Sequence, residues 1–380
     1  MKILYLFRSL AVWGGIERIL VDKMNWLVSE NNTEVFLLTT DQGEHPIVYS
    51  LNERVHFEDL NINFYRRYQY SFYRRLGISY QMRQKYKRLL SNRIHSVRPD
   101  IIVCTTADQI DVITELKGDV PLIVESHSIC NRTIGQGKNV LRCFRRYNFL
   151  KSLKKTNCVV SLTEGDASEW RHFHKKVIVI PNMLHPCKSR QSSLMSKRVI
   201  WVGRLDYQKR AEIALSIWDL VVQKHPDWCL DIYGEGEVES DIKTKASQLK
   251  STFVHKPTAQ IFDCYFDSSI LISTSLFEPF GLVMVEAMSC GLPVVAFDCP
   301  YGPADIITDG MNGFLVPFYN KNYFSDKVCL LMEDDSLRIR MGHAAYTFSK
   351  RFYADGIMPK WKSLFDDITK NNNIICKIEK

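Results

Sequence analysis

Two glutamates, Glu278 and Glu286, lie in one of the most apolar stretches of the chain, SLFEPFGLVMVEAMSCGLPVV at residues 275–295. Valines, an alanine and a methionine surround Glu286, so this stretch predicts a buried helix. A buried, unpaired carboxylate costs several kcal/mol or takes up a proton. Ribose would satisfy Glu286, because two vicinal hydroxyls can donate to one carboxylate. An arginine or lysine partner within the fold would satisfy it equally well.

Two cations follow a predicted strand at 199–203. Arg204 comes directly after that strand, and Lys209 lies five residues later, where a helix is expected to begin. Cations at the carboxyl end of a strand and at a helix N-terminus can hold a diphosphate. The alternative is a solvated surface pair. The turn YGEGE at 233–237 is acidic, which favours a plain strand-to-helix turn over a phosphate loop.

Glycines mark two helix starts at which a ligand could approach the backbone. Gly14 and Gly15 precede an amphipathic helix beginning near Ile16, although the spacing is not GxGxxG. Phe280-Gly281-Leu282 follows Pro279, which suits a first helical turn, and would present free amides there. For the first pair, the alternative is a tight turn without a ligand.

The elements that must position these residues are short apolar strands alternating with longer helical patterns. Continuous apolar runs are typical of parallel strands covered on both faces, so the chain predicts doubly wound α/β sheets. The predicted strands are 2–7, 34–39, 101–104, 121–126, 157–162, 177–180, 199–203, 229–234, 252–254, 270–273, 293–297 and 313–316. A polar segment with two prolines at 181–198 reads as the linker between two Rossmann-like domains.

Composition narrows the class of protein. The 380 residues are 46% hydrophobic and 24% charged, as in a soluble globular protein of two domains or more. Eleven scattered cysteines favour free thiols over disulfides or a zinc site. No apolar run approaches 18 residues, so we expect no transmembrane helix. The net charge is +8, and residues 1–185 hold 27 Lys and Arg against 18 Asp and Glu, so the basic excess belongs to the N-terminal half.

Several segments together resemble glycosyltransferase family 4. The first is the pair of glutamates eight residues apart, Glu278 and Glu286, within the apolar stretch. Four further segments match in chain order: GGIER, VIVIPNML, VGRLDYQK and the C-terminal FSKRFYADGIMPKWKSLF. The resemblance covers nearly the whole chain. It implies a retaining, nucleotide-sugar-dependent enzyme of the GT-B fold, with two Rossmann-like doubly wound α/β domains facing across a cleft. The implied divisions are residues 1–185 on the acceptor side, residues 186–355 for the nucleotide-sugar, and a helix at 356–380 that crosses back to the first domain.

The resemblance also implies a role for each site residue. Arg204 and Lys209 would hold the donor diphosphate, Glu286 the ribose hydroxyls, and Glu278 the transferred sugar. His127, in ESHS at the end of a predicted strand, resembles the family's active-site histidine. The remaining expected contacts are Gly14 and Gly15 for phosphate and acceptor, the backbone of Phe280, Gly281 and Leu282 for sugar or phosphate, and Lys256, in VHKP, for the base. Many relatives have glycine where Lys256 stands, so base recognition stays open.

The expected reaction transfers a hexose or N-acetylhexosamine from a nucleotide-sugar, most simply a UDP-sugar, to a glycan acceptor. Two cations balance the charge of the leaving diphosphate, and therefore neither a metal nor a cofactor is expected. A nucleotide-sugar epimerase, another GT-B enzyme such as a phosphorylase, and a non-catalytic nucleotide-sugar-binding protein are the alternatives. An epimerase needs no acceptor, and a binding protein need not keep Arg204, Lys209 and Glu286.

Two basic segments, 64–98 and 138–155, interleave Arg and Lys with Tyr and Phe. This pattern suits an anionic membrane surface, and it also occurs in nucleic-acid-binding proteins and on solvated helices with the aromatics turned inward. With the family resemblance, we expect no nucleic acid partner. We expect instead a cytoplasmic protein, peripheral on the inner face of the cytoplasmic membrane, that acts on a lipid-linked acceptor in surface polysaccharide synthesis, such as capsule, O-antigen or lipopolysaccharide.

Overall fold

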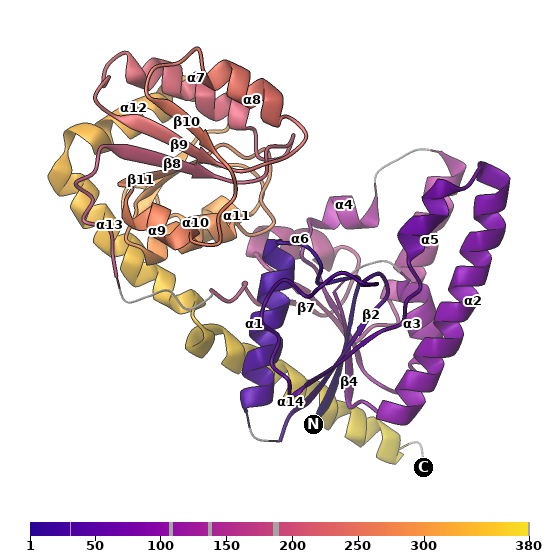
Figure 1. Cartoon of the computed structure of the whole chain (residues 1–380). Coiled ribbons are helices and arrows are strands. Elements are labelled where there is room, and N and C mark those ends of the chain that lie inside the picture. The colour runs from indigo at the N-terminus through magenta and orange to yellow at the C-terminus, as the bar shows by residue number, and fades with distance from the viewer. Residues whose placement is uncertain (31, 106–108, 136–138, 185–189, 379–380) are drawn as a thin grey trace. The chain divides into compact units, whose positions relative to one another are not determined.

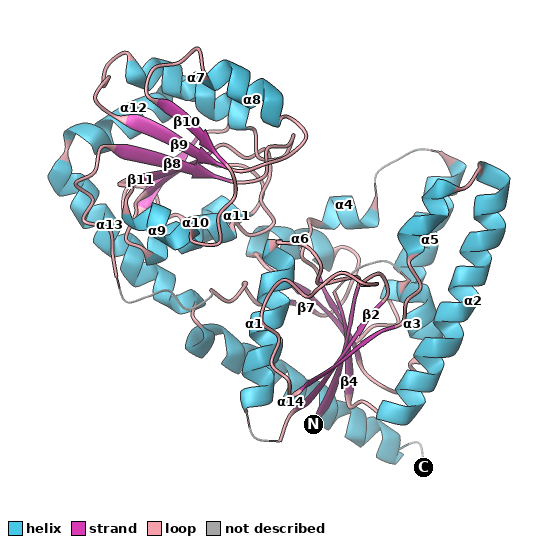
Figure 2. Ribbon diagram, viewed as in Figure 1, coloured by secondary structure: helices cyan, strands magenta, loops and turns pink. Residues whose placement is uncertain are grey.

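The computed structural model describes residues 1–30, 32–105, 109–135, 139–184 and 190–378. The chain forms two compact units. Unit 1 comprises Met1–Met183 together with Ile357–Lys380, and unit 2 comprises Leu184–Gly356. Each unit is a parallel β-sheet with helices on both faces (Figures 1 and 2), as the sequence predicts. Among the described residues, no helix combines the length and hydropathy needed to cross a bilayer.

Unit 1 has a seven-stranded sheet in the order β3-β2-β1-β4-β5-β6-β7. Its strands are β1 (Lys2–Phe7), β2 (Glu34–Thr39), β3 (Val55–Asp59), β4 (Ile101–Cys104), β5 (Leu122–Glu125), β6 (Cys158–Ser161) and β7 (Val177–Val179). Its helices are α1 (Gly15–Ser29), η1 (Phe64–Gln69), α2 (Phe72–Val97), α3 (Ile110–Leu116), α4 (Cys130–Ile134), α5 (Val140–Leu153) and α6 (Glu164–Arg171).

Unit 2 has a six-stranded sheet in the order β10-β9-β8-β11-β12-β13. Its strands are β8 (Arg198–Val202), β9 (Cys229–Tyr233), β10 (Thr252–His255), β11 (Ile270–Ser273), β12 (Val294–Phe297) and β13 (Gly313–Val316). Its helices are α7 (Ala211–Val222), α8 (Glu239–Ala246), α9 (Ile261–Phe266), α10 (Leu282–Ser289), α11 (Gly302–Ile306), α12 (Lys321–Glu333), α13 (Asp335–Ser349) and η2 (Lys350–Phe352). The last helix, α14 (Ala354–Ile378), leaves unit 2 and joins unit 1.

The twelve strands predicted from apolar runs are all present, and β3 is an additional one. The sequence of β3, VHFED, has a single fully buried residue, Val55, because the strand lies at the edge of its sheet. Since three of its five residues are His56, Glu58 and Asp59, β3 lacks the continuous apolar run of the other strands, and the pattern used for them could not detect it.

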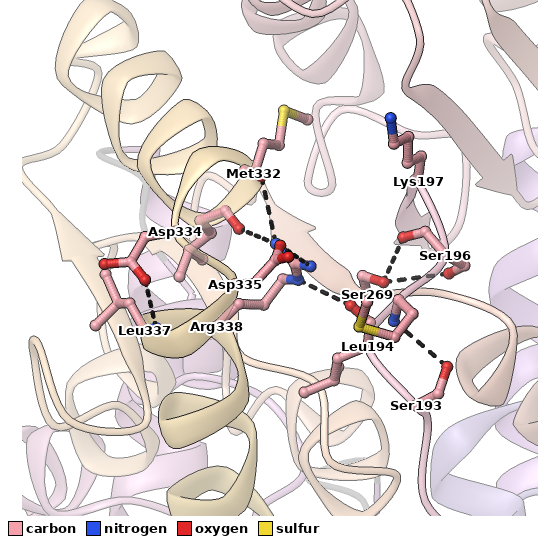
Figure 3. Close-up of polar contacts among 12 residues, drawn as sticks. Ser193, Leu194, Ser196, Lys197, Ser269, Met332, Asp334, Asp335, Leu337 and Arg338 are labelled. Carbon is pink, nitrogen blue, oxygen red and sulfur yellow. Dashed lines mark hydrogen bonds and ion pairs between the residues drawn. The ribbon is translucent and has the colours of Figure 1, made fainter.

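A buried arginine ties the start of unit 2 to its last helices. Arg338 of α13 donates to the carbonyl oxygen of Leu194 (2.9 Å) and to the carboxylate of Asp335 (2.6 Å), both labelled in Figure 3. It also donates to the carbonyl oxygen of Leu331 (2.7 Å). Its guanidinium therefore satisfies carbonyls that would otherwise be buried without donors. These contacts hold Leu194, which lies in the predicted linker at 181–198, against α13. Residues 185–189 of that linker lie outside the described residues.

Candidate active site

The second sheet explains why residues far apart in sequence meet. The chain runs from β8 outward to β9 and β10, then returns to place β11 on the other side of β8. In doubly wound sheets, ligands bind at this reversal, outside the carboxyl ends of the two strands. The segment after β8 carries Arg204 and Lys209, and the segment after β11 carries Glu278. The topology therefore brings the predicted cations and the first predicted carboxylate to one place.

Lys209 and Glu278 form an ion pair at this edge. Lys209 Nζ lies 2.5 Å from Glu278 Oε1, and the hydroxyl of Ser275 donates to the same oxygen at 2.7 Å. The side chains expose 17% and 6% of their surface, so the carboxylate is buried and only the lysine is partly exposed. The Glu278 backbone is also held, since its N–H donates to Pro300 O at 2.7 Å and its carbonyl accepts from Gly302 N at 2.8 Å. The carboxylate thus sits on a rigid loop.

Arg204 stands in a different environment from Lys209. Its guanidinium lies 3.0 Å from Asp206 and 3.3 Å from the Gln208 side chain, and the side chain is 68% exposed. Asp206 also accepts hydrogen bonds from the backbone N–H groups of Gln208 and Lys209, both at 3.0 Å, and so shapes the loop that carries both cations. Arg204 is free to turn toward a ligand, whereas Lys209 is held.

The YGEGE turn supports this loop instead of forming a site of its own. A Cβ on Gly234 would lie 2.0 Å from the carbonyl oxygen of Gly203, and one on Gly236 would lie 2.4 Å from that of Leu205. The two segments are also joined by a hydrogen bond from Leu205 N to Glu235 O at 2.8 Å. The glycines therefore allow one loop to pack closely on the other, which agrees with the interpretation of this segment as a structural turn.

Helix α10 begins at Leu282, and Gly281 is its N-cap residue with φ of +100°. This left-handed conformation favours glycine, and a Cβ there would also lie 2.1 Å from the Met284 side chain. The Phe280 side chain is buried and packs edge-on against Phe352 at 5.5 Å, so it is the backbone and not the side chain of Phe280 that stays a predicted ligand contact. The helix starts three residues after Pro279, later than the sequence suggests.

Glu286 is buried in the middle of α10, as its apolar neighbours predict. The hydroxyl of Tyr265, from α9, donates to Glu286 Oε2 at 3.3 Å. Burial raises the pKa of Tyr265 well above its ordinary value, and the nearby charge of Glu286 raises it further. The tyrosine therefore stays protonated and remains a hydrogen-bond donor to the carboxylate.

The predicted site residues of unit 1 lie at the carboxyl ends of β1 and β5. Gly14 is the N-cap residue of α1, and a Cβ on it would lie 2.2 Å from the carboxylate of Glu17. Glu17 therefore folds back against Gly14, over the N-terminus of its own helix. Burial raises the pKa of Glu17, although its own backbone N–H and the charge of His127 lower it. His127 is buried, and its Nε2 lies 3.2 Å from Glu125 Oε1.

Lys256 follows β10 in unit 2 and faces an acidic side chain. Its Nζ lies 3.0 Å from Glu239 Oε1, and 65% of the side chain is exposed. Nothing in this geometry tests a contact with a base, so that assignment stays a prediction.

Sequence reasoning missed three residues around His127. Glu17 and Glu125 stand within the segments GGIER and ESHS, but no spacing or pattern in the sequence distinguishes them from other acidic residues. Lys23 had a clear signal: it falls on the face of α1 that carries Leu20, Met24 and Leu27, all buried. A charged residue on an apolar helical face predicts a buried partner.

Two family models match consecutive parts of the chain. "Glycosyltransferase Family 4" matches residues 13–186, and "Glycosyl transferases group 1" matches residues 188–348. An uncharacterized glycosyltransferase of Haemophilus influenzae is 26% identical, covering 96% of this chain and 99% of its own. The poly(ribitol-phosphate) alpha-N-acetylglucosaminyltransferase of Staphylococcus aureus is 30% identical over 57% of this chain, a match that spans only 45% of that relative.

Solved structures share the fold. TarM of S. aureus, solved with UDP, superposes with a TM-score of 0.76 at 18% identity, covering 96% of this chain and 99% of TarM. Anabaena HepE, also solved with UDP, gives a TM-score of 0.75 at 17% identity, covering 97% of this chain and all (100%) of HepE. At these identities the likeness concerns the fold alone.

Proposed function

The chain belongs to the family 4 glycosyltransferases of GT-B fold, and on this premise we propose that it transfers a hexose or N-acetylhexosamine from a UDP-sugar to a glycan acceptor with retention of configuration. The observation that carries the proposal is the meeting of Lys209 and Glu278 at the reversal of the second sheet. Arg204, on the loop of Lys209, supplies the second cation. The neighbours of similar fold that were solved with UDP support the choice of UDP, and the N-acetylglucosaminyltransferase of S. aureus supports an N-acetylhexosamine as the sugar.

In the ligand-free protein Lys209 is neutralised by Glu278. A donor diphosphate brings negative charge to the same edge, where Lys209 and Arg204 provide charge-assisted hydrogen bonds. Lys209 then shares its ammonium between the diphosphate and Glu278, and the carboxylate gains capacity to accept from a sugar hydroxyl. When the donor binds, each member of the pair therefore gains a new partner. Lys209 binds the diphosphate anion, and Glu278 accepts a hydrogen bond from a sugar hydroxyl.

The reaction breaks the bond between the anomeric carbon and the diphosphate oxygen, whose electron pair stays on the phosphate. Arg204, Lys209 and the backbone amides at the start of α10 stabilise that developing charge. The acceptor oxygen bonds to the anomeric carbon on the same face, and its proton passes to the departing phosphate. His127 orients hydroxyls near the transferred sugar, and Glu286 accepts from the ribose hydroxyls. No carboxylate is assigned as a covalent nucleophile.

A thermal-shift screen of UDP-, GDP-, ADP- and CMP-sugars tests the donor class. A ligand at 100 times its Kd stabilises the folded state by about 2.7 kcal/mol, which is enough to rank the bases. Proton NMR of the product with an acceptor glycan then reports the anomeric configuration. A screen in which UDP-sugars give no shift, or a product with inverted configuration, would remove the corresponding part of the proposal.

We further propose that the acceptor is lipid-linked and that unit 1 binds an anionic membrane. The aromatic side chains at the start of α2 face solvent, with Tyr73 84% exposed. Phe72 and Tyr80 on the same helix, and Phe144 and Tyr147 on α5, are exposed as well. This distribution argues against aromatics turned to the core. Exposed aromatics beside cations suit the interface between headgroups and acyl chains. Residue 138 of the second basic segment lies outside the described residues.

The cations of α2 divide into two groups. Lys87 and Arg93 form ion pairs with Glu115 and Glu58. Within the described parts of the chain, Arg74 and Arg75 form no ion pair, and Arg75 instead lies 5.8 Å from the ring centre of Phe72. The uncompensated charge therefore coincides with the exposed aromatics at the start of the helix.

Co-sedimentation with vesicles tests this surface. Phosphatidylcholine vesicles with and without phosphatidylglycerol are compared for the wild type and two variants of equal charge. Arg74→Gln/Arg75→Gln removes uncompensated charge and should weaken binding to anionic vesicles by about 30-fold, at roughly 1 kcal/mol per cation. Lys87→Gln/Arg93→Gln removes cations that carboxylates already balance and should bind almost normally. Equal losses in both variants, or no binding by the wild type, would count against a membrane surface here.

A further inference from the structure

A lysine lies in the core of unit 1. Lys23, on α1, exposes 2% of its side chain, among helix positions that are otherwise apolar. Removing an ammonium from water costs several kcal/mol unless a charge and hydrogen bonds compensate it. The proposed reaction assigns no task to Lys23, so its surroundings decide what it does.

The compensating charge is Glu125, the last residue of β5. Lys23 Nζ lies 2.5 Å from both carboxylate oxygens, and Glu125 also exposes only 2% of its side chain. Burial by itself would raise the pKa of Glu125, but the charges of Lys23 and His127 and their hydrogen bonds lower it to about 2. Burial pulls the pKa of Lys23 downward. The net contribution of the pair to folding is therefore a small difference between a large desolvation cost and a large attraction.

Aromatic rings close the pair off from solvent. The indole of Trp361, on α14, has its centre 4.0 Å from Lys23 Nζ, and the ring of Tyr5, on β1, has its centre at 5.3 Å. Both rings are buried. The ammonium is thus held from four elements, namely α1, β1, β5 and the C-terminal helix, and a ring face is a favourable neighbour for a desolvated cation.

The same carboxylate also faces His127. His127 Nε2 lies 3.2 Å from Glu125 Oε1, and its side chain exposes 3% of its surface. Neither ring nitrogen has a well-aligned hydrogen bond within the described residues. Nε2 still lies within reach of Glu125, so Nδ1 is the ring nitrogen that is left for a ligand to complete. The charged groups around this ring are Glu125 on β5, Glu17 on α1 and, through Glu125, Lys23.

We propose that Lys23 and Trp361 are positioning residues for the active-site histidine: they hold the Glu125 carboxylate in place, and Glu125 sets the orientation and tautomer of His127. Glu125 favours a proton on Nε2, the nitrogen that faces it, and leaves Nδ1 to accept a hydrogen bond from a sugar or acceptor hydroxyl. This inference rests on the proposed function, in which His127 orients hydroxyls near the transferred sugar.

A purely structural ion pair makes a different prediction. Replacing both members of a buried pair by apolar residues is often neutral or stabilising, whereas removing one member is costly. Lys23→Met/Glu125→Leu should therefore fold about as stably as the wild type under either view. Only the positioning role predicts that this double variant still loses activity, because His127 has lost its carboxylate.

The experiment compares the wild type, Lys23→Met, Lys23→Met/Glu125→Leu and a control, Lys87→Met/Glu115→Leu. The control removes an exposed pair of the same chemistry, with a separation of 2.6 Å. Urea unfolding, hydrolysis of UDP-glucose and UDP-N-acetylglucosamine without acceptor, and ¹⁵N NMR of the imidazoles are measured on each protein. The His127 signals are assigned by their absence in His127→Gln.

We expect the double variant to keep wild-type stability, to lose about 10- to 100-fold in kcat with an unchanged KM, and to distribute the His127 proton over both nitrogens. The wild type and the control should show the proton on Nε2 and equal activity. A stable double variant with wild-type kcat and an unchanged imidazole spectrum would overturn the proposal. If no protein hydrolyses either UDP-sugar, the proposed donor is wrong, while the NMR spectra of the ligand-free proteins still decide whether Glu125 sets the tautomer.

Discussion

Lys23–Glu125 in unit 1 and Lys209–Glu278 in unit 2 are ion pairs of the same chemistry, each with a nitrogen–oxygen distance of 2.5 Å. Their surroundings differ. Each side chain of the first pair exposes 2% of its surface, and aromatic rings cover the ammonium. In the second pair the lysine exposes 17%, and a serine hydroxyl shares the carboxylate. We call Lys23–Glu125 the closed pair and Lys209–Glu278 the open pair. The closed pair cannot exchange partners without unfolding its surroundings, whereas the lysine of the open pair can accept an incoming anion.

The open pair should therefore act directly on the charge that develops in the reaction, and the closed pair indirectly, through the position of His127. The largest expected effect is on turnover in Arg204→Ala/Lys209→Ala. Losing one charge-stabilising group in an active site typically costs about 10²- to 10³-fold in kcat, so the double variant should lose at least about 10³-fold. Its melting temperature should stay close to that of the wild type, because Arg204 is mostly exposed. Steady-state kinetics with the best donor measure this, and wild-type turnover in the double variant would refute the assignment of both cations.

The same substitution in both pairs should change the stability of the protein by different amounts. Lys23→Met leaves Glu125 buried without its cation and should lower the free energy of unfolding by about 3 to 5 kcal/mol. Lys209→Met should lower it by less than about 1 kcal/mol, since that pair is partly exposed and Ser275 still donates to Glu278. Urea denaturation of both variants measures the difference. Equal losses of stability in the two variants would mean that the two ion pairs contribute to folding in the same way, despite their different burial.

Acid should weaken the closed pair in a defined pH range. The pKa of Glu125 falls from its ordinary value of 4.5 to about 2 in the folded protein. Between these values the unfolded chain binds more protons, so stability rises with pH. The contribution of Glu125 is therefore fully present above pH 4.5 and is lost as the pH falls toward 2. Relative to Lys23→Met/Glu125→Leu, the wild type should lose roughly 2 to 3 kcal/mol across this range.

Urea unfolding of both proteins between pH 5 and pH 2 measures this loss, and the other carboxylates titrate alike in each protein. If the free energy of unfolding changed with pH in the same way in both proteins, Lys23 would not stabilise the charged form of Glu125.

The two pairs also differ in how far sequence predicts them. The strand pattern predicts doubly wound sheets with ligands at the carboxyl ends of the strands, and the resemblance to family 4 assigns Arg204, Lys209 and Glu278 to one donor site. Their contact could not be predicted, because Ser275 and the backbone of the loop after β11 set the Glu278 rotamer. Such details depend on loop conformation, which no periodicity encodes.

The closed pair is harder to foresee. Lys23 on the buried face of α1 predicts an internal partner, but the sequence does not say which of the acidic residues of unit 1 it meets. Glu125 is the partner because the strand order places β5 beside β4, and the last residue of β5 then contacts Lys23 of α1. Both the strand order and the register of the sheet are needed to foresee this contact. The third contributor, Trp361, comes from the far end of the chain. Contacts of such long sequence separation follow from the complete fold only.

The smallest expected effects concern Glu278, in the loop before α10, and Glu286, within α10. They separate a role in turnover from a role in donor binding. Glu278, paired with Lys209 where charge develops, should act on turnover, so Glu278→Ala should lower kcat by about 10- to 100-fold. Glu286 lies about one turn into α10, where Tyr265 donates to it. Its removal should raise the donor KM by about tenfold with little change in kcat, as expected when ground state and transition state lose the same contact.

Tyr265→Phe deletes only the hydroxyl that holds Glu286, a hydrogen bond worth about 1 kcal/mol, and should raise the donor KM by up to about fivefold. Steady-state kinetics at varied donor concentration separate these outcomes. If the Glu278 and Glu286 variants changed kcat and KM alike, the open pair at Lys209 would not be the place where charge develops, and Glu278 would bind the donor in the same passive way as Glu286.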